Sequence, residues 1–121
     1  MPIQNILVVD DSPTDRQHLT DMLSKSGYKV TTAENAEDAF VKVKQFKPDL
    51  VLMDIVMPGQ NGFQATRELS KNESTKHIPV IICTTKGQET DKVWGMRQGA
   101  QDYIVKPVNQ ADLLAKISKL G

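Results

Sequence analysis

The chain has 121 residues, a length typical of one domain with a core of its own. Its 15 Lys and Arg residues balance its 15 Asp and Glu residues. This balance disfavours a nucleic-acid-binding module, which is usually basic. The single cysteine, Cys83, excludes an intramolecular disulfide framework and suits a reducing compartment. No apolar stretch approaches the ~20 residues of a membrane span, and no signal peptide is visible. We therefore expect a small cytoplasmic protein that binds neither nucleic acid nor membrane.

Five short apolar runs recur along the chain and predict β-strands. Residues 6–9, 50–53 and 80–83 are almost wholly apolar, as strands covered on both faces tend to be. Residues 28–32 alternate between apolar and polar, which suits an edge strand, and residues 103–105 form the last run. Each interval between successive runs is long enough for one helix, so the pattern predicts repeated strand–helix units.

The intervals between the runs carry signals for helix starts. A Ser or Asn stands three residues before an acidic residue or Gln four times: Ser12 with Asp15, Asn35 with Asp38, Asn61 with Gln64, and Asn109 with Asp112. This is the spacing of an N-cap residue and the third helical residue. Pro13 follows Ser12, as expected for a first helical residue. Gly27 and Gly99 stand where a helix should end before the next strand.

Strict alternation of strand and helix predicts an α/β fold with a parallel sheet, because right-handed crossovers then place helices on both faces. Apolar residues at helical spacing in the first, second and fifth helices give each of them one stripe to bury. Five units are too few for an eight-unit barrel and fit a doubly wound, five-stranded sheet with five helices. The units fill residues 1–121, which predicts a single domain without an effector domain.

Polar residues follow four of the predicted strands, at the sheet edge where open α/β folds bind ligands. Asp10 and Asp11 follow the first strand, Asp54 the third, Thr84 the fourth and Lys106 the fifth. One such aspartate alone is usually a helix cap or a solvated turn, but the five residues together indicate a site. If the first and third strands are neighbours, three carboxylates converge, and their repulsion calls for protonation or a bound cation. Oxygen ligands favour a hard ion, Mg²⁺ or Ca²⁺.

These residues resemble the response-regulator receiver domain, whose fold is described as flavodoxin-like or CheY-like. The resemblance covers the whole chain and rests on motifs that match in order and spacing: Asp10-Asp11 after residues 6–9, Asp54 within residues 52–59, Gly62, Thr84, and Lys106-Pro107. It implies the strand order 2-1-3-4-5. Residues 56–67 and 84–95 further resemble a stand-alone regulator of the chemotaxis-like system that controls type IV pili and twitching motility.

The resemblance implies a separate role for each acidic residue. Asp54 would be the phosphoacceptor, a nucleophile that takes a phosphoryl group from a phosphohistidine of a sensor histidine kinase. Asp11 and Asp54 would bind Mg²⁺ directly, together with the main-chain carbonyl of Val56, and Asp10 would act mainly through a bound water. The ion would offset the repulsion among the carboxylates and hold the oxygens of the transferring phosphoryl group.

The other matching residues would recognise the phosphoryl group and transmit its presence. Lys106 would pair with one phosphoryl oxygen, and the hydroxyl of Thr84 would donate to another. The Lys106–Pro107 bond would be cis, an isomer that is plausible because proline follows. Tyr103 would turn inward as Thr84 moves. The partner-binding face would comprise the fourth helix, the fifth strand and the fifth helix, with these residues on it: Lys92, Met96, Tyr103, Val105 and Lys116.

The implied function is that of a stand-alone response regulator, phosphorylated by a CheA-type histidine kinase. It would signal through contacts with a downstream protein, or drain phosphoryl groups as a phosphate sink without such a partner. No enzyme activity is expected beyond assistance to its own phosphorylation and dephosphorylation. The alternative is a small Mg²⁺-dependent phosphohydrolase with an aspartyl nucleophile. Such phosphatases carry a general acid two residues after the nucleophile, where this chain has Val56, and this difference disfavours turnover.

Four further positions leave questions open. Val56 and Lys86 occupy positions that modulate phosphoryl loss in receiver domains, so the resemblance predicts no lifetime for the phosphorylated state. Cys83 lies within an apolar strand and is expected to be a buried, unreactive thiol. Trp94 lies about 100° around the fourth helix from Val93. It would either pack on a flank of the domain or anchor a partner.

Overall fold

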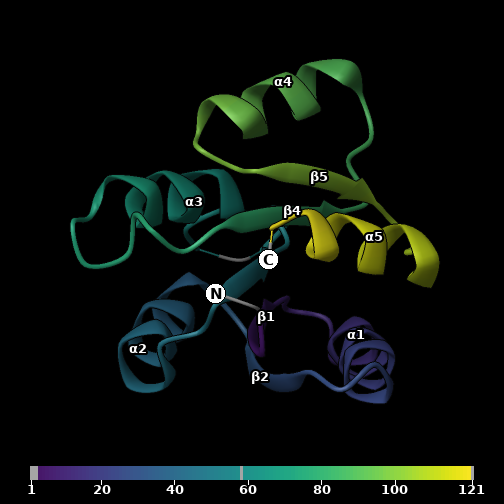
Figure 1. Ribbon diagram of the computed structural model, residues 1–121. Coiled ribbons are helices and arrows are strands. Elements are labelled where there is room, and N and C mark those ends of the chain that lie inside the picture. The colour runs from purple at the N-terminus through teal and green to yellow at the C-terminus, as the bar shows by residue number, and fades with distance from the viewer. Residues whose placement is uncertain (1–2, 58, 121) are drawn as a thin grey trace.

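The computed structural model describes residues 3–57 and 59–120, which form one parallel sheet between helices (Figure 1). The elements follow in strict alternation: β1 (Asn5–Val9), α1 (Pro13–Lys25), β2 (Lys29–Ala33), α2 (Ala36–Phe46), β3 (Leu50–Met53), α3 (Gly62–Lys71), β4 (Val80–Thr84), α4 (Glu89–Arg97), β5 (Asp102–Val105) and α5 (Gln110–Leu120). None of the helices within these residues is long and apolar enough to cross a membrane.

The sheet has the strand order β2-β1-β3-β4-β5, so the predicted doubly wound topology is confirmed. All four strand pairings are parallel. The alternating strand, β2, lies at one edge, and the apolar strands β1, β3 and β4 lie inside the sheet. Strands in the middle of a parallel sheet are covered on both faces, which explains why their sequences show no alternation.

Successive side chains of the central strands enter two different cores. On β1, Leu7 and Val9 join a cluster with α2 and α3, whereas Ile6 and Val8 join a cluster with α1 and α5. This division follows from the period of two along a strand. Figure 1 shows α1 and α5 on one side of the sheet and α2 and α3 on the other.

The four predicted N-caps all form. The side chains of Ser12, Asn35, Asn61 and Asn109 accept hydrogen bonds from the backbone N–H groups three residues later, at 3.3, 2.8, 3.0 and 2.9 Å. Each bond satisfies one of the N–H groups that a helix start leaves unpaired. The fourth helix differs, because its N-cap residue, Gln88, makes no side-chain capping bond.

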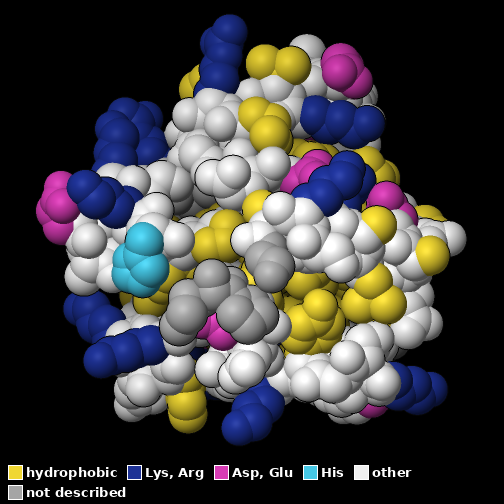
Figure 2. Space-filling view, viewed as in Figure 1, with side chains coloured by type: hydrophobic (Ala, Val, Ile, Leu, Met, Phe, Trp, Pro, Cys, Tyr) yellow, Lys and Arg dark blue, Asp and Glu magenta, His cyan; other side chains and the backbone are white. Residues whose placement is uncertain are grey.

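Helix α4 packs on the sheet through a glycine. Gly95 is buried, and a Cβ atom added there would lie 2.7 Å from Cδ1 of Ile82. Val93, Trp94 and Met96 are instead 47%, 49% and 45% exposed. Figure 2 shows hydrophobic side chains on the surface in the region of α4, at the top of the view. Half of the Trp94 surface is therefore exposed, which fits both of its interpretations, so its role stays a prediction.

Cys83 is expected to resist alkylation in the folded chain. Its side chain is 2% exposed, and burial raises the pKa of its thiol to about 12. The thiolate is the reactive form, so the thiol of Cys83 is protected at pH 8 both because it is buried and because it stays protonated. Thiol labelling with iodoacetamide, followed by intact mass, should give no product in native buffer and complete reaction in denaturant. Rapid labelling of the folded chain would contradict this packing.

Candidate functional site

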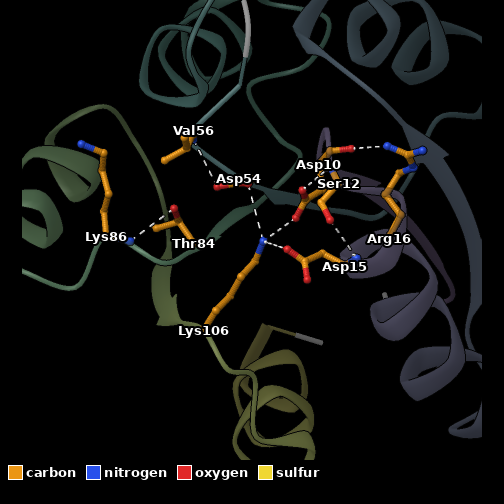
Figure 3. Close-up of polar contacts among 9 residues, drawn as sticks. All are labelled: Asp10, Ser12, Asp15, Arg16, Asp54, Val56, Thr84, Lys86 and Lys106. Atoms are coloured by element: carbon orange, nitrogen blue, oxygen red, sulfur yellow. Dashed lines mark hydrogen bonds and ion pairs between the residues drawn. The ribbon is translucent and has the colours of Figure 1, made fainter.

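Four strands deliver polar side chains to one edge of the sheet (Figure 3). β1 ends at Val9 and β3 at Met53, and these two residues are partners in the parallel pairing. The residues that follow, Asp10 and Asp54, are therefore brought side by side. Thr84 ends β4, and Lys106 follows β5 directly. The sequence prediction of convergence at the carboxyl ends of the strands is confirmed in its geometry.

Three carboxylates form an acidic cluster. Asp10, Asp11 and Asp54 each offer an oxygen such that the three oxygens lie within 4.8 Å of one another. Asp10 and Asp54 are buried, whereas Asp11 is exposed. Backbone N–H groups orient the buried pair: Ser12 donates to Oδ1 of Asp10 at 2.9 Å, and Val56 donates to Oδ1 of Asp54 at 3.2 Å. An oxygen-only donor set of this charge fits a hard divalent cation.

Lys106 places a positive charge beside this cluster. Its Nζ lies 2.6 Å from Oδ2 of Asp10, 2.8 Å from Oδ2 of Asp15 and 3.5 Å from Oδ2 of Asp54. Burial alone would lower the pKa of Lys106, but the hydrogen bonds to Asp10 and Asp15 and the charge of Asp54 outweigh burial and raise it. The ammonium thus stays protonated in every ordinary buffer. The Lys106–Pro107 bond is cis, as the resemblance implied.

Burial dominates the titration of Asp10. Loss of hydration raises the pKa of its carboxyl, and the hydrogen bonds from Lys106 and Ser12 oppose this effect. The charge of Asp54 adds to the rise. A neighbouring negative charge disfavours ionisation of a carboxyl, and a bound cation relieves that repulsion.

Thr84 and Tyr103 lie on β4 and β5 next to the cluster. Thr84 is fully buried, and its Oγ1 accepts from the Lys86 N–H at 3.5 Å. The ring of Tyr103 is already turned inward, into a cluster with Ile55 and Ile82, and its hydroxyl donates to the carbonyl of Lys86 at 2.6 Å. Burial, followed by the charge of Asp91, raises the pKa of Tyr103 to about 12. Its movement with Thr84 stays a prediction.

The predicted partner-face residues all lie on α4, β5 and α5, but they are not equally accessible. Met96 is exposed, and Lys92 and Val105 are half-buried. Lys116, on α5, is bonded to Asp112 at 3.2 Å. Tyr103 is only 9% exposed because its ring packs in a core cluster with Ile55 and Ile82. The use of this face by a partner stays a prediction.

Asp15 is the site residue that sequence reasoning assigned to a different role. Its backbone N–H is capped as predicted, but its carboxylate also pairs with Lys106, ninety-one positions further along the chain. One feature of the sequence could have indicated this pair: the first turn of α1 follows the acidic pair closely and therefore lies at the same edge of the sheet. Arg16 adds a second link, since its guanidinium donates to the carbonyl of Asp10 at 2.7 Å.

The model of the response regulator receiver domain family matches residues 6–118. The chain therefore belongs to the response-regulator receiver domain family, as its fold and its strand-end residues indicate. The predicted resemblance to this family is confirmed.

Relatives and solved structures agree with this assignment. The chain is 62% identical to Protein PilH of Pseudomonas aeruginosa over 113 residues, which are 93% of each chain. It is 39% identical over 114 residues to the phosphate regulon transcriptional regulatory protein PhoB of the same organism, and there it spans 50% of the relative. The chemotaxis protein CheY4 of Vibrio cholerae superimposes with a TM-score of 0.91 at 29% identity, over 98% of this chain and 99% of that one.

Proposed function

We propose that Asp54 accepts a phosphoryl group from a histidine kinase and that the chain signals through the resulting change of shape. The observation that carries the proposal is the setting of Asp54: a buried carboxylate with an oxygen within 4.8 Å of oxygens of Asp10 and Asp11, and with the Lys106 ammonium at 3.5 Å. The carboxylate of Asp54 thus offers a nucleophilic oxygen. The Lys106 ammonium beside it can pair with a phosphoryl group, and the neighbouring carboxylates can hold a cation.

The reaction balances with this chain's own groups and the donor. An oxygen of Asp54 attacks the phosphorus of a phosphohistidine, an O–P bond forms, and the P–N bond breaks with its electron pair left on the imidazole. Oδ2 of Asp54 is the oxygen that faces Lys106, because Oδ1 holds the Val56 N–H. Lys106 then pairs with one phosphoryl oxygen, and Thr84 donates its hydroxyl to another.

The acidic cluster would hold Mg²⁺, with Asp11 and Asp54 as direct ligands, the Val56 main-chain carbonyl as a third, and Asp10 acting through water. When bound, the ion neutralises carboxylate charge and stabilises the charge on the transferring phosphoryl group. The chain's own residues supply the rest: burial keeps Asp54 in place, and the backbone N–H groups of Ser12 and Val56 fix the carboxylate planes.

The partner would be a CheA-type histidine kinase of a cytoplasmic signalling system for type IV pili and twitching motility. The similarity to PilH, over nearly the full length of both chains, supports this assignment. The output would be a downstream protein that contacts α4, β5 and α5, or no protein if the chain acts as a phosphate sink. Half-exposed Val93, Trp94 and Met96 support the first of these outputs.

The phosphohydrolase alternative has no general acid at the position two residues after Asp54. Val56, two residues after Asp54, is apolar and exposed, and its backbone N–H donates to Oδ1 of Asp54. A steady-state assay against phosphate esters should therefore give no turnover above a matched blank. Sustained release of phosphate that depends on Asp54 would favour the alternative.

Phosphotransfer tests the proposal directly. A purified CheA-type kinase, first phosphorylated on its histidine with labelled ATP, is mixed with this chain and Mg²⁺. The label should leave the kinase and enter this chain, and chelation of the metal should stop the transfer. Retention of all label on the kinase, when the same preparation phosphorylates a known receiver domain, would contradict the proposal.

The response to phosphorylation should reach α4 and β5. Beryllofluoride, which stands in for the phosphoryl group on Asp54, should shift amide NMR signals around Tyr103 and Val105 as well as those near the site. The cause is that Thr84 and Lys106 contact the added charge in only one of two arrangements. Thr84→Ala should bind beryllofluoride yet transmit less of the change to Tyr103. Unmoved signals on α4 and β5 at full occupancy would contradict this coupling.

A further inference from the structure

Lys106 has more carboxylate partners than a phosphoryl contact alone explains. Its ammonium is held by Asp10 at 2.6 Å and by Asp15 at 2.8 Å, while Asp54 stands off at 3.5 Å. Figure 3 shows the ammonium between Asp54 on one side and Asp10 and Asp15 on the other. Of these three partners of Lys106, Asp10 and Asp54 belong to the cluster of Asp10, Asp11 and Asp54, whereas Asp15 lies outside it.

Local structure fixes Asp15 at this place. It is the third residue of α1, and its N–H bonds to Oγ of the N-cap Ser12 at 3.3 Å. The next residue, Arg16, anchors the same helical turn by donating to the carbonyl of Asp10 at 2.7 Å. These two bonds hold the backbone turn that carries Asp15, and the carboxylate itself, 42% exposed, is held by its pair with Lys106.

A lysine and a divalent cation compete for the same oxygens. Each carboxylate that neutralises the ammonium is less available to the cation, and the two positive charges repel each other. Without a further partner, Lys106 would turn fully onto Asp10 and Asp54, which the cation needs. Asp15 gives the ammonium a second close carboxylate that is not in the cluster, so that Asp10 shares the ammonium with Asp15. Asp54, at 3.5 Å, is then left more available to the cation while Lys106 remains within reach of it.

We propose that Asp15 is a positioning residue, which holds Lys106 beside the site and thereby strengthens the binding of Mg²⁺ by the acidic cluster. The inference rests on the proposed function, since it deepens the role of that same cluster. Its measurable consequence is an effect of Asp15 on metal affinity that is transmitted through Lys106.

The test is Mg²⁺ titration followed by amide NMR shifts, without any phosphodonor. Asp15→Asn should weaken Mg²⁺ binding about two- to fivefold, the range expected for a partly exposed ion pair. Asp21→Asn is the matched control, because it removes the same charge from the same helix at an exposed residue that contacts only Gln17 among the described hydrogen bonds. Asp15→Glu keeps the charge and should restore most of the affinity.

A double-mutant cycle separates an effect through Lys106 from a direct effect on the ion. In a Lys106→Met background, Asp15→Asn should weaken Mg²⁺ binding no more than Asp21→Asn does. The proposal is overturned if Asp15→Asn matches Asp21→Asn in the otherwise unchanged chain. It is equally overturned if Asp15→Asn keeps its full effect without Lys106.

Asp11→Ala, measured in parallel, distinguishes failure of the inference from failure of the proposed function. If Asp11→Ala removes Mg²⁺ binding and Asp15→Asn has no special effect, the metal site stands and only the role of Asp15 is wrong. If Asp11→Ala binds Mg²⁺ as well as the unchanged chain, the cluster is not the metal site. Thermal unfolding without Mg²⁺ checks that each variant is folded.

Discussion

Asp54→Asn is expected to abolish phosphorylation of this chain by acetyl phosphate. Asparagine has nearly the same volume, and its carbonyl oxygen can still accept the N–H of Val56, so the local structure is retained. The amide has no carboxylate oxygen to attack phosphorus, and it removes one negative charge from the acidic cluster. Intact mass spectrometry after incubation with acetyl phosphate and Mg²⁺ should show one added phosphoryl group on the unchanged chain and none on the variant.

Asp112→Asn is the matched control, because it makes the same change at an exposed residue of α5. It should be labelled as fully as the unchanged chain. Equal labelling of Asp54→Asn would remove Asp54 as the phosphoacceptor. Labelling of neither protein, with a known receiver domain phosphorylated in parallel, would contradict the proposed function itself.

Gly62→Ala should destabilise the fold by about 3 kcal/mol, at the upper end of the usual cost of overpacking. Gly62 is the first residue of α3, and its N–H bonds to the carbonyl of Ile55 at 3.3 Å. A Cβ atom there would lie 2.1 Å from the backbone oxygen of Asp54 and 2.6 Å from Cα of Ile55. Backbone cannot rotate away as a side chain can, so the loop that carries Asp54 must shift. Chemical denaturation gives the free energy of unfolding directly.

Gly95→Ala offers the matched comparison. Its Cβ would also be too close to a neighbour, 2.7 Å from Cδ1 of Ile82, but that neighbour is the end of a flexible side chain. Alanine also favours a helix interior over glycine by ~1 kcal/mol, which offsets part of the strain. We expect a net cost near zero to about 1 kcal/mol. A Gly62→Ala variant as stable as Gly95→Ala would show that the loop at Asp54 is not tightly packed.

The features that could be predicted from the sequence are those set by short-range patterns. Three apolar runs identified the inner strands, and residues 28–32 identified one of the two edge strands, because burial on one or two faces decides whether apolar residues alternate. Capping pairs located four helix starts, since the donors and acceptors are only three residues apart. The convergence of Asp10 and Asp54 followed from strand order and parallel pairing.

The contacts that the sequence did not predict join residues far apart in the chain, and short-range sequence patterns carry no information about such pairs. The Asp15–Lys106 pair joins residues at the start of α1 and the end of β5, and a capping motif explains Asp15 without it. The residue of α4 that faces the sheet is Gly95, because a glycine allows the helix to approach Ile82 and Tyr103 closely. Hydrophobic periodicity does not identify such a position, since glycine has no side chain. The bond from Tyr103 to the Lys86 carbonyl likewise required coordinates.

Chemical location of the phosphoryl group tests the central claim most directly. The unchanged chain is phosphorylated with acetyl phosphate and Mg²⁺ and then reduced with borohydride, which converts an aspartyl phosphate to homoserine. Peptide sequencing by mass spectrometry should find homoserine at position 54, with Asp10 and Asp11 intact. Homoserine at position 10 or 11, or phosphate retained on a serine, threonine or histidine, would contradict the assignment of Asp54 as the phosphoacceptor.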